Sequence, residues 1–150
     1  MTDNSKIISE LNGLVEKCCD GVTGYKNAAE NSNSVPLRNF FHAKSNQRDR
    51  FASDLKSEIR RMGGEVKDTD GSALGTMHRM WMDIKTAFST NIEETVLDAC
   101  ENGEESIIED YDHMLNEHLM EANTRNLLQS QRNEIARTKR TIEFLEDVHE

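Results

Sequence analysis

Residues 4–31, NSKIISELNGLVEKCCDGVTGYKNAAEN, carry the pattern that decides the fold. Their apolar side chains recur at steps of three and four residues, which places them on one face of a helix. These positions are Ile7, Leu11, Leu14, Cys18, Val22, Tyr25 and Ala29. The polar run 31–34 ends this helix, and Pro36 suits the first turn of the next one. The stretch therefore predicts a long amphipathic helix with one buried face.

The same periodicity predicts three further long helices, at about 36–62, 92–118 and 121–148. Short loops join the first helix to the second and the third to the fourth. About 28 residues separate the second from the third, and two antiparallel hairpins joined by one long crossover have the ferritin-like connectivity. We therefore expect one all-α domain over 1–150, a ferritin-like four-helix bundle.

The long crossover is expected to contain a short amphipathic helix. Apolar residues share one side of this segment, namely Leu74, Met77, Trp81, Ile84 and Phe88. His78, Arg79 and Trp81 are the candidates for anchoring it to the bundle. Packing against the bundle is favoured over a role in lining a groove.

The charge balance and the cysteines exclude several classes of function. Lys and Arg total 18 against 28 Asp and Glu, so the net charge is −10, which argues against non-specific binding to nucleic acid or anionic membrane. No apolar run approaches the roughly 20 residues of a membrane span, and the N-terminus lacks the features of a signal peptide. Cys18, Cys19 and Cys100 fit neither a disulfide framework nor a zinc spacing. A cytoplasmic protein is therefore expected.

Polar residues interrupt three of the apolar faces. Lys44 and Arg48 lie in the second helix, between phenylalanines of its stripe. Glu104 lies within the stripe of the third helix, with Glu101 at its edge one turn earlier. Gln131 and Thr138 lie in the stripe of the fourth helix, with Glu134 beside it. The first helix is expected to contribute none, because Glu16 and Asp20 fall on the side away from its stripe.

Two interpretations of these residues stay open. In the structural one, Lys44 and Arg48 oppose Glu101 and Glu104, and Gln131 completes a hydrogen-bonded network, since buried charges must be paired. In the other, Glu101, Glu104 and Glu134 hold iron or manganese. Ferritin-like di-metal sites use Glu-x-x-His pairs, and none is assigned here to an inner face. Two cations among the ligands would also repel a metal ion, so the structural interpretation, with no cofactor, is preferred.

The histidines receive no metal role from the sequence. His42, His113 and His149 are expected to face outward. His118 falls at the end of the third helix, where a cation is favourable against the helix dipole.

The chain resembles a bacterial family of ferritin-like domains of unknown function, described as "four-helix-bundle protein" and found mainly in proteobacteria. The stretches that carry the resemblance are Leu11-Asn12, Asp20-Gly21, Gly24-Tyr25, Ala28-Ala29-Glu30, Leu37-Arg38, Phe40-Phe41, Arg48, Phe51-Ala52, Gly63-Gly64-Glu65, Gly71-Ser72, Gly75, His78-Arg79, Trp81, Cys100-Glu101, Gly103-Glu104, Tyr111 and Gln131. The resemblance implies a ferritin-like bundle, an arginine at 48 together with glutamates at 101 and 104, and no established activity. A histidine that the family tends to show late in the last helix is replaced here by Arg140 or a neighbour, which disfavours a metal site.

The first hypothesis for function is a non-catalytic helical-bundle protein whose internal polar network replaces a di-iron site. It leaves open a stress-associated role, self-association into a homo-oligomer and an unidentified protein partner. The alternative is a degenerate ferritin-like metal-binding protein or oxidase that uses Glu101 and Glu104.

Overall fold

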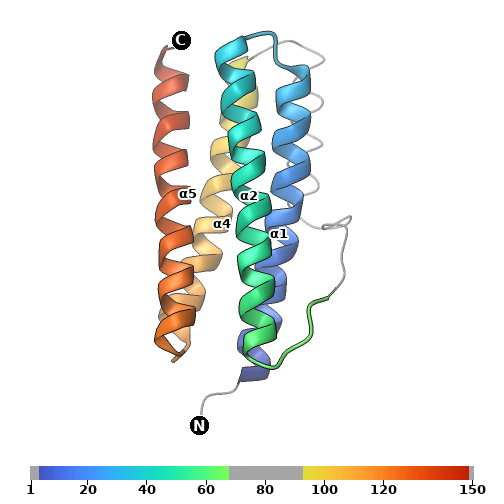
Figure 1. Ribbon diagram of the computed structural model, residues 1–150. Coiled ribbons are helices and arrows are strands. Elements are labelled where there is room, and N and C mark those ends of the chain that lie inside the picture. Colours follow the sequence, from blue (N-terminus) through green and yellow to red (C-terminus); the bar gives the residue numbers. More distant parts are fainter. Residues whose placement is uncertain (1–3, 68–92, 149–150) are drawn as a thin grey trace.

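A computed structural model of the protein describes residues 4–67 and 93–148, which form four long helices (Figure 1). They are α1 (Asn4–Asn31), α2 (Val35–Arg61), α4 (Glu93–Glu117) and α5 (Ala122–Val148). Each bound lies within a residue of the predicted one, so the all-α prediction is confirmed. The predicted crossover helix, with His78, Arg79 and Trp81, lies outside the described residues.

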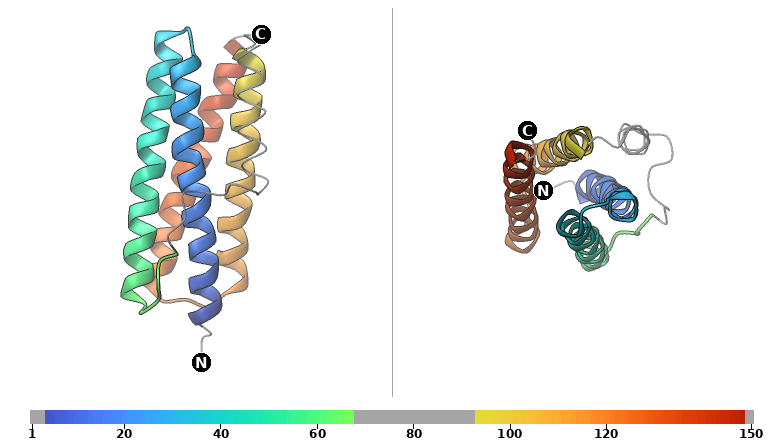
Figure 2. Two further views of the ribbon diagram at one scale, coloured as in Figure 1. Left: turned by 90° about the vertical axis from the view of Figure 1, so that its right-hand side faces the viewer. Right: turned by 90° about the horizontal axis from the view of Figure 1, so that it is seen from above.

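The four helices form two hairpins that pack side by side. α1 pairs with α2, α4 pairs with α5, and the hairpins meet where α1 packs against α4 and α2 against α5. In Figure 1, α1 and α5 run upward while α2 and α4 run downward, and the end-on view of Figure 2 places the parallel helices on diagonals. Every adjacent pair is therefore antiparallel, which sets the helix dipoles in opposition.

The diagonal placement explains the length of the crossover. α4 has 25 residues, and at a rise of 1.5 Å per residue it is about 38 Å long. Because α2 and α4 run in the same direction, the end of α2 and the start of α4 lie at opposite ends of the bundle. The predicted connectivity, two hairpins with one long connection, is confirmed.

α2 begins and ends within one residue of its predicted bounds and is capped at both ends. The Ser34 hydroxyl accepts a hydrogen bond from a backbone N–H of the first turn, and Pro36 lies in that turn. At the other end, Gly63 has φ 81°, and the amides of Gly63 and Gly64 donate to carbonyls of the last turn at 3.0 and 2.9 Å. This is a Schellman motif. Gly64 also has no room for a side chain, because a Cβ there would lie 2.8 Å from Ile8.

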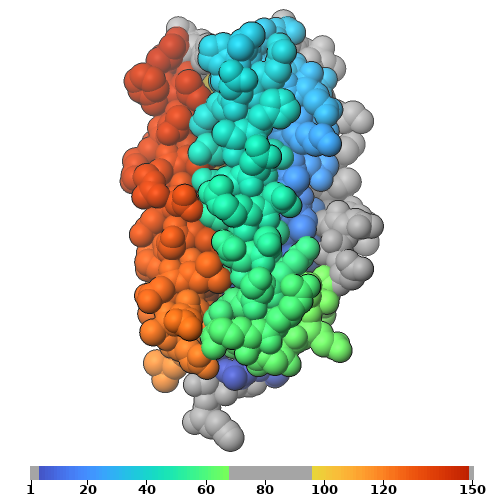
Figure 3. All heavy atoms as spheres, viewed as in Figure 1, coloured from blue at the N-terminus to red at the C-terminus, as the bar shows by residue number. Residues whose placement is uncertain are grey.

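The interior contains two apolar clusters, one toward each end of the bundle. One comprises Ile7, Leu11, Leu14, Val15, Cys18, Phe51, Ala52, Leu55, Ile59, Ile107, Tyr111, Met114, Leu115, Leu128 and Ile135. The other comprises Tyr25, Ala28, Ala29, Leu37, Phe41, Val96, Leu97, Cys100 and Ile142. In Figure 3, α2 lies between α1 and α5 and covers this face of the interior. Among the described helices, none is long and apolar enough to cross a membrane.

Candidate functional site: a buried ion pair inside the bundle

Arg48 of α2 and Glu104 of α4 form an ion pair between the two apolar clusters. Nη2 of Arg48 donates a hydrogen bond to Oε2 of Glu104, and each side chain is only 2% exposed. The pair joins diagonally opposed helices and so spans the interior from one hairpin to the other. A charge buried alone in such a site costs several kcal/mol, so each group depends on the other.

The arginine reaches this position because α1 carries a glycine beside it. A Cβ added to the buried Gly21 would lie 3.1 Å from Cγ of Arg48, closer than ordinary contact. One residue on, the carbonyl of Val22 accepts a hydrogen bond from the Ser45 hydroxyl at 2.9 Å. The small residues at 21 and 45 thus let α2 approach α1, and the stem of Arg48 lies across the glycine.

Tyr25 of α1 encloses the pair from the side of the second cluster. Its ring centroid lies 5.6 Å from Cζ of Arg48, within the range of a cation–π contact. Burial raises the pKa of Tyr25 well above its usual value, and the charge of Glu104 and a hydrogen bond to it add to this. Burial alone would lower the pKa of Arg48, but several effects together raise it, and the charge of Glu104 is the largest of these. The tyrosine is thus a neutral donor and the arginine a permanent cation.

A second polar layer lies two turns along the bundle. The Tyr111 hydroxyl donates to Oε1 of Gln131 at 2.6 Å, and Nε2 of Gln131 donates to the carbonyl of Phe51 at 3.3 Å. The thiol of Cys18 lies 4.0 Å from the same hydroxyl, and burial raises its pKa to about 12. Because Tyr111 follows Glu104 by seven residues, the two layers are about 10 Å apart. Gln131 therefore connects α5 to α4 and α2, and its contacts are in this layer.

The other predicted members of the network lie at its margin. The Lys44 ammonium is half-buried and lies 5.6 Å from the centre of the Phe40 ring. Burial lowers the pKa of Lys44, and the charge of Arg48 lowers it further. Glu134 faces Arg50 at 3.9 Å. The structure thus brings Arg48 together with Glu104 and gives Lys44 and Glu134 other neighbours.

Glu101 belongs to a separate group of carboxylates near the top of Figure 1, where α4 begins and α5 ends. Oxygens of Asp98, Glu101 and Glu146 all lie within 4.8 Å of one another. Burial raises the pKa of Glu146 to about 9, with further contributions from hydrogen bonds to Asp98 and Glu101 and from their charges. Sequence analysis missed Glu146, although it begins a Glu-x-x-His spacing with His149. His149 lies outside the described residues.

Glu146→Gln is expected to flatten the pH dependence of stability. Between pH 4.5 and about 9 the folded state holds a proton on Glu146 that the unfolded state releases, so the stability of the wild type falls as pH rises through this range. The variant loses this slope, and near pH 9 it gains about 0.5–1 kcal/mol because two like-charge contacts are removed. Urea denaturation across this range checks the slope. Glu109→Gln, an exposed change on α4, is the control, and parallel curves for all three proteins would contradict the assignment.

The first helix contributes two buried polar residues that sequence analysis did not place there. Asp20 was expected to face away from the apolar stripe and is buried instead. That expectation was wrong because α1 packs against both α2 and α4, which buries a wider arc than one stripe. Asn12 is buried as well, and its side chain donates to the carbonyl of Glu65 at 3.0 Å and accepts from the amide of Lys67 at 2.9 Å. It holds the segment after α2 against α1.

An ion pair within α2, linked to α5 by a hydrogen bond, was also missed. Nε and Nη2 of Arg61 donate to the two oxygens of the buried Glu58 at 2.8 and 2.7 Å. The Thr124 hydroxyl of α5 donates to the same carboxylate. The hydrogen bond from Arg61 is the main cause that lowers the pKa of Glu58. The i, i+3 spacing of the two charged residues was the signal that could have indicated this pair.

Comparison with known proteins adds one match. A family described as a domain of unknown function (DUF2383) matches residues 6–117. The matched range contains Arg48 and Glu104 and ends where α4 ends, before α5. No curated protein matches the chain.

Proposed function

The chain belongs to the family described as domain of unknown function DUF2383, and we propose that it is a non-catalytic ferritin-like bundle with a structural ion pair where a di-metal site would lie. The observation that carries this proposal is the buried pair of Arg48 and Glu104 between the two hairpins. The long crossover and the antiparallel neighbours support the ferritin-like assignment. The contacts of Gln131 and Thr124 with α2 support treating all four helices as one domain.

The charge of Arg48 is the main argument against a metal at this point. Ferritin-like di-metal sites gather carboxylates from all four helices and two histidines around the ions. A divalent cation at about 4 Å from the guanidinium would be repelled by roughly 8 kcal/mol at an effective dielectric constant of about 20. The carboxylate of Glu104 is already hydrogen-bonded to the arginine. A degenerate metal-binding protein or oxidase using Glu101 and Glu104 would first have to separate this pair.

The ion pair has a specific structural task in this proposal. Apolar side chains can slide past one another at little cost, whereas a buried pair is satisfied in one register of α2 against α4. The pair would thus set how one hairpin meets the other. The three free cysteines support a cytoplasmic location, because reducing compartments preserve thiols. The proposal applies equally to a monomer and to a homo-oligomer.

Protein expressed in medium supplemented with iron and manganese, and purified without chelator or affinity tag, is expected to contain no iron or manganese that depends on Glu104. The physical reason is the guanidinium that Glu104 already holds. Elemental analysis of the purified protein checks this. Bound iron or manganese that is lost in Glu104→Ala and kept in the exposed control Glu109→Ala would overturn the proposal in favour of the metal-binding alternative.

A further inference from the structure

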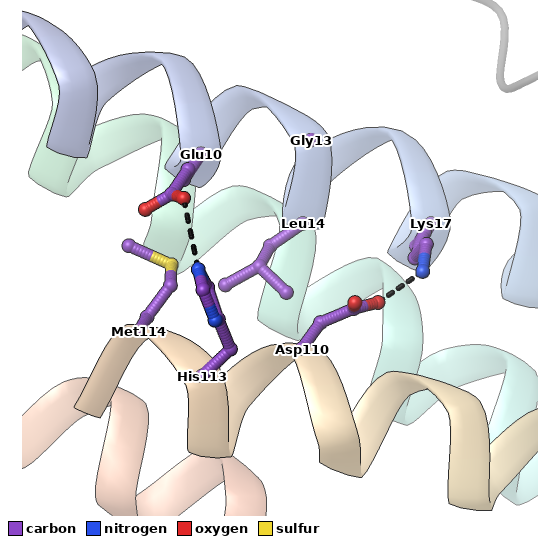
Figure 4. A pocket seen from close by; sticks show the side chains of 7 residues that line it. All are labelled: Glu10, Gly13, Leu14, Lys17, Asp110, His113 and Met114. Atoms are coloured by element: carbon purple, nitrogen blue, oxygen red, sulfur yellow. Dashed lines mark hydrogen bonds and ion pairs between the residues drawn. The ribbon is translucent and has the colours of Figure 1, made fainter. Parts of the chain in front are cut away.

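A group of potential metal ligands lies far from the ion pair, at the end of the bundle where α1 begins and α4 ends. Nε2 of His118 contacts Oε2 of Glu10, and Nε2 of His113 lies 3.4 Å from Oε1 of the same carboxylate. Figure 4 shows Glu10 and His113 facing each other across the two helices. The side chains of Glu10 and His118 are 26% and 12% exposed, and that of His113 is 59% exposed. Two ring nitrogens therefore converge on one carboxylate from a partly sheltered position.

The backbone of α4 explains how both histidines reach the same point. His113 lies in the last turns of α4, and His118 is the first residue beyond it. The amide of His118 still donates to the carbonyl of Met114 at 3.3 Å, so the chain continues the helical turn at this position. The two rings are nearly perpendicular, at 89°, with centroids 6.3 Å apart. They meet Glu10 from different sides and do not stack.

The ligand atoms lie close enough together to share one ion. The two histidine nitrogens and the Glu10 carboxylate each offer an atom within 4.8 Å of the others. Bonds of about 2.0–2.1 Å in a tetrahedral zinc site place neighbouring ligand atoms about 3.3 Å apart. The separation of 3.4 Å between Nε2 of His113 and Oε1 of Glu10 agrees with this value, whereas His118 contacts Glu10 directly and would have to move apart from it to admit an ion.

We propose that Glu10, His113 and His118 bind a divalent transition-metal ion of the zinc class. Imidazole nitrogen and carboxylate oxygen are ligands that zinc accepts, whereas magnesium and calcium prefer oxygen alone. Three protein ligands leave one tetrahedral position for water or another ligand. The net charge of −10 favours the approach of a cation.

A pocket lies beside two of the three ligands, Glu10 and His113. This pocket has a volume of about 210 Å³ and lies between α1 and α4. Its lining includes Glu10, Gly13 and His113, and a Cβ at Gly13 would meet no atom within 4 Å. In Figure 4 the ion pair of Lys17 and Asp110 lies at the opposite side of the pocket from Glu10. The pocket has room for water and for a small oxygen ligand on the metal.

Titration of zinc chloride into metal-free, untagged protein, followed by isothermal calorimetry, tests the proposal. We expect one equivalent of zinc per chain, with affinity at least about 100-fold weaker in His113→Ala, because loss of even an outer partner of a metal ligand costs about 10–100-fold. His118→Ala and Glu10→Gln should weaken binding similarly. Because His113 is the most exposed of the three, its variant retains the fold most readily, and urea denaturation verifies this for each protein.

His42→Ala is the matched control, since this histidine is exposed on α2, and it should bind zinc like the wild type. The double variant Arg48→Met with Glu104→Leu should also keep the site, because neither residue contributes to it. Absence of stoichiometric zinc in the wild type, or equal affinity in His113→Ala, would overturn the site and leave the proposed function intact. Zinc lost only when Glu104 is replaced would overturn both proposals.

Discussion

Arg48→Met is expected to destabilise the protein by about 3–5 kcal/mol, because it leaves Glu104 as an unpaired carboxylate in the interior. Both side chains are 2% exposed, so water cannot replace the lost guanidinium without opening the bundle. Glu104→Leu alone should be damaging for the converse reason, since the cation of Arg48 loses its only carboxylate partner in the described part of the chain. Urea denaturation followed by circular dichroism measures both losses.

The double variant distinguishes a structural pair from a metal site. Arg48→Met combined with Glu104→Leu should recover much of the loss, because apolar packing can match a buried ion pair in stability. The double-mutant cycle should therefore show a large coupling energy. In a metal site, Glu104→Leu would remove a ligand with or without Arg48, and added metal would stabilise only the wild type. Losses that simply add would show that the two residues do not interact.

Arg50→Met is the matched control for the arginine. Arg50 is on the same helix, but its side chain is 59% exposed and its contact with Glu134 is 3.9 Å long. Exposed ion pairs of this kind contribute about 0–1 kcal/mol. If Arg50→Met lost as much stability as Arg48→Met, burial of the ion pair could not be the cause of the loss in Arg48→Met.

Tyr25→Ala is expected to cost about 3–5 kcal/mol, because it opens a cavity beside the buried cation. The ring is fully buried, lies 5.6 Å from Cζ of Arg48 and packs at 6.1 Å against the ring of Phe41. Tyr25→Phe keeps both ring contacts and removes only the buried hydroxyl, which interacts with Glu104. That change should cost about 1–3 kcal/mol, the usual range for a buried acceptor that loses its donor.

The informative quantity is the difference in stability loss between Tyr25→Ala and Tyr25→Phe. Thermal and urea denaturation of the alanine and phenylalanine variants should separate the ring from the hydroxyl. Phe40→Ala, a partly buried aromatic change on α2, is the control for general loss of packing. Equal losses in Tyr25→Phe and Tyr25→Ala would assign the whole effect to the hydroxyl and contradict the packing argument.

The helices could be predicted because each one buries apolar residues that recur every three or four positions. The apolar stripe of residues 4–31 and the stop at Gly63 are local signals, and their reading requires no knowledge of neighbouring helices. Arg48 and Glu104 were also visible as polar residues within apolar stripes. That these two charges face each other follows from the diagonal placement of α2 and α4, which the sequence indicates only through the long crossover.

The partners at the margin of the site were harder to predict. Glu101 lies three residues before Glu104. A helix rotates about 300° over three residues, which is less than a full turn, so the two side chains point in different directions. Glu101 therefore lies beside Asp98 and Glu146. The contact of Glu10 with His118 joins residues 108 positions apart. The residue pattern of a single helix cannot predict such a contact, because the contact depends on how the two hairpins are aligned along the bundle.

The two-hairpin arrangement also has a consequence for folding kinetics. Contacts within each hairpin close short loops and cost little entropy, whereas Arg48 and Glu104 are 56 residues apart and must wait until the hairpins meet. We therefore expect the two charges to lose their water late, after most of the rate-limiting step has passed. Interactions formed so late hardly affect the rate of folding, and their free energy appears as a lower rate of unfolding. The buried pair would therefore determine how long the native bundle persists once formed, more than how quickly it is reached.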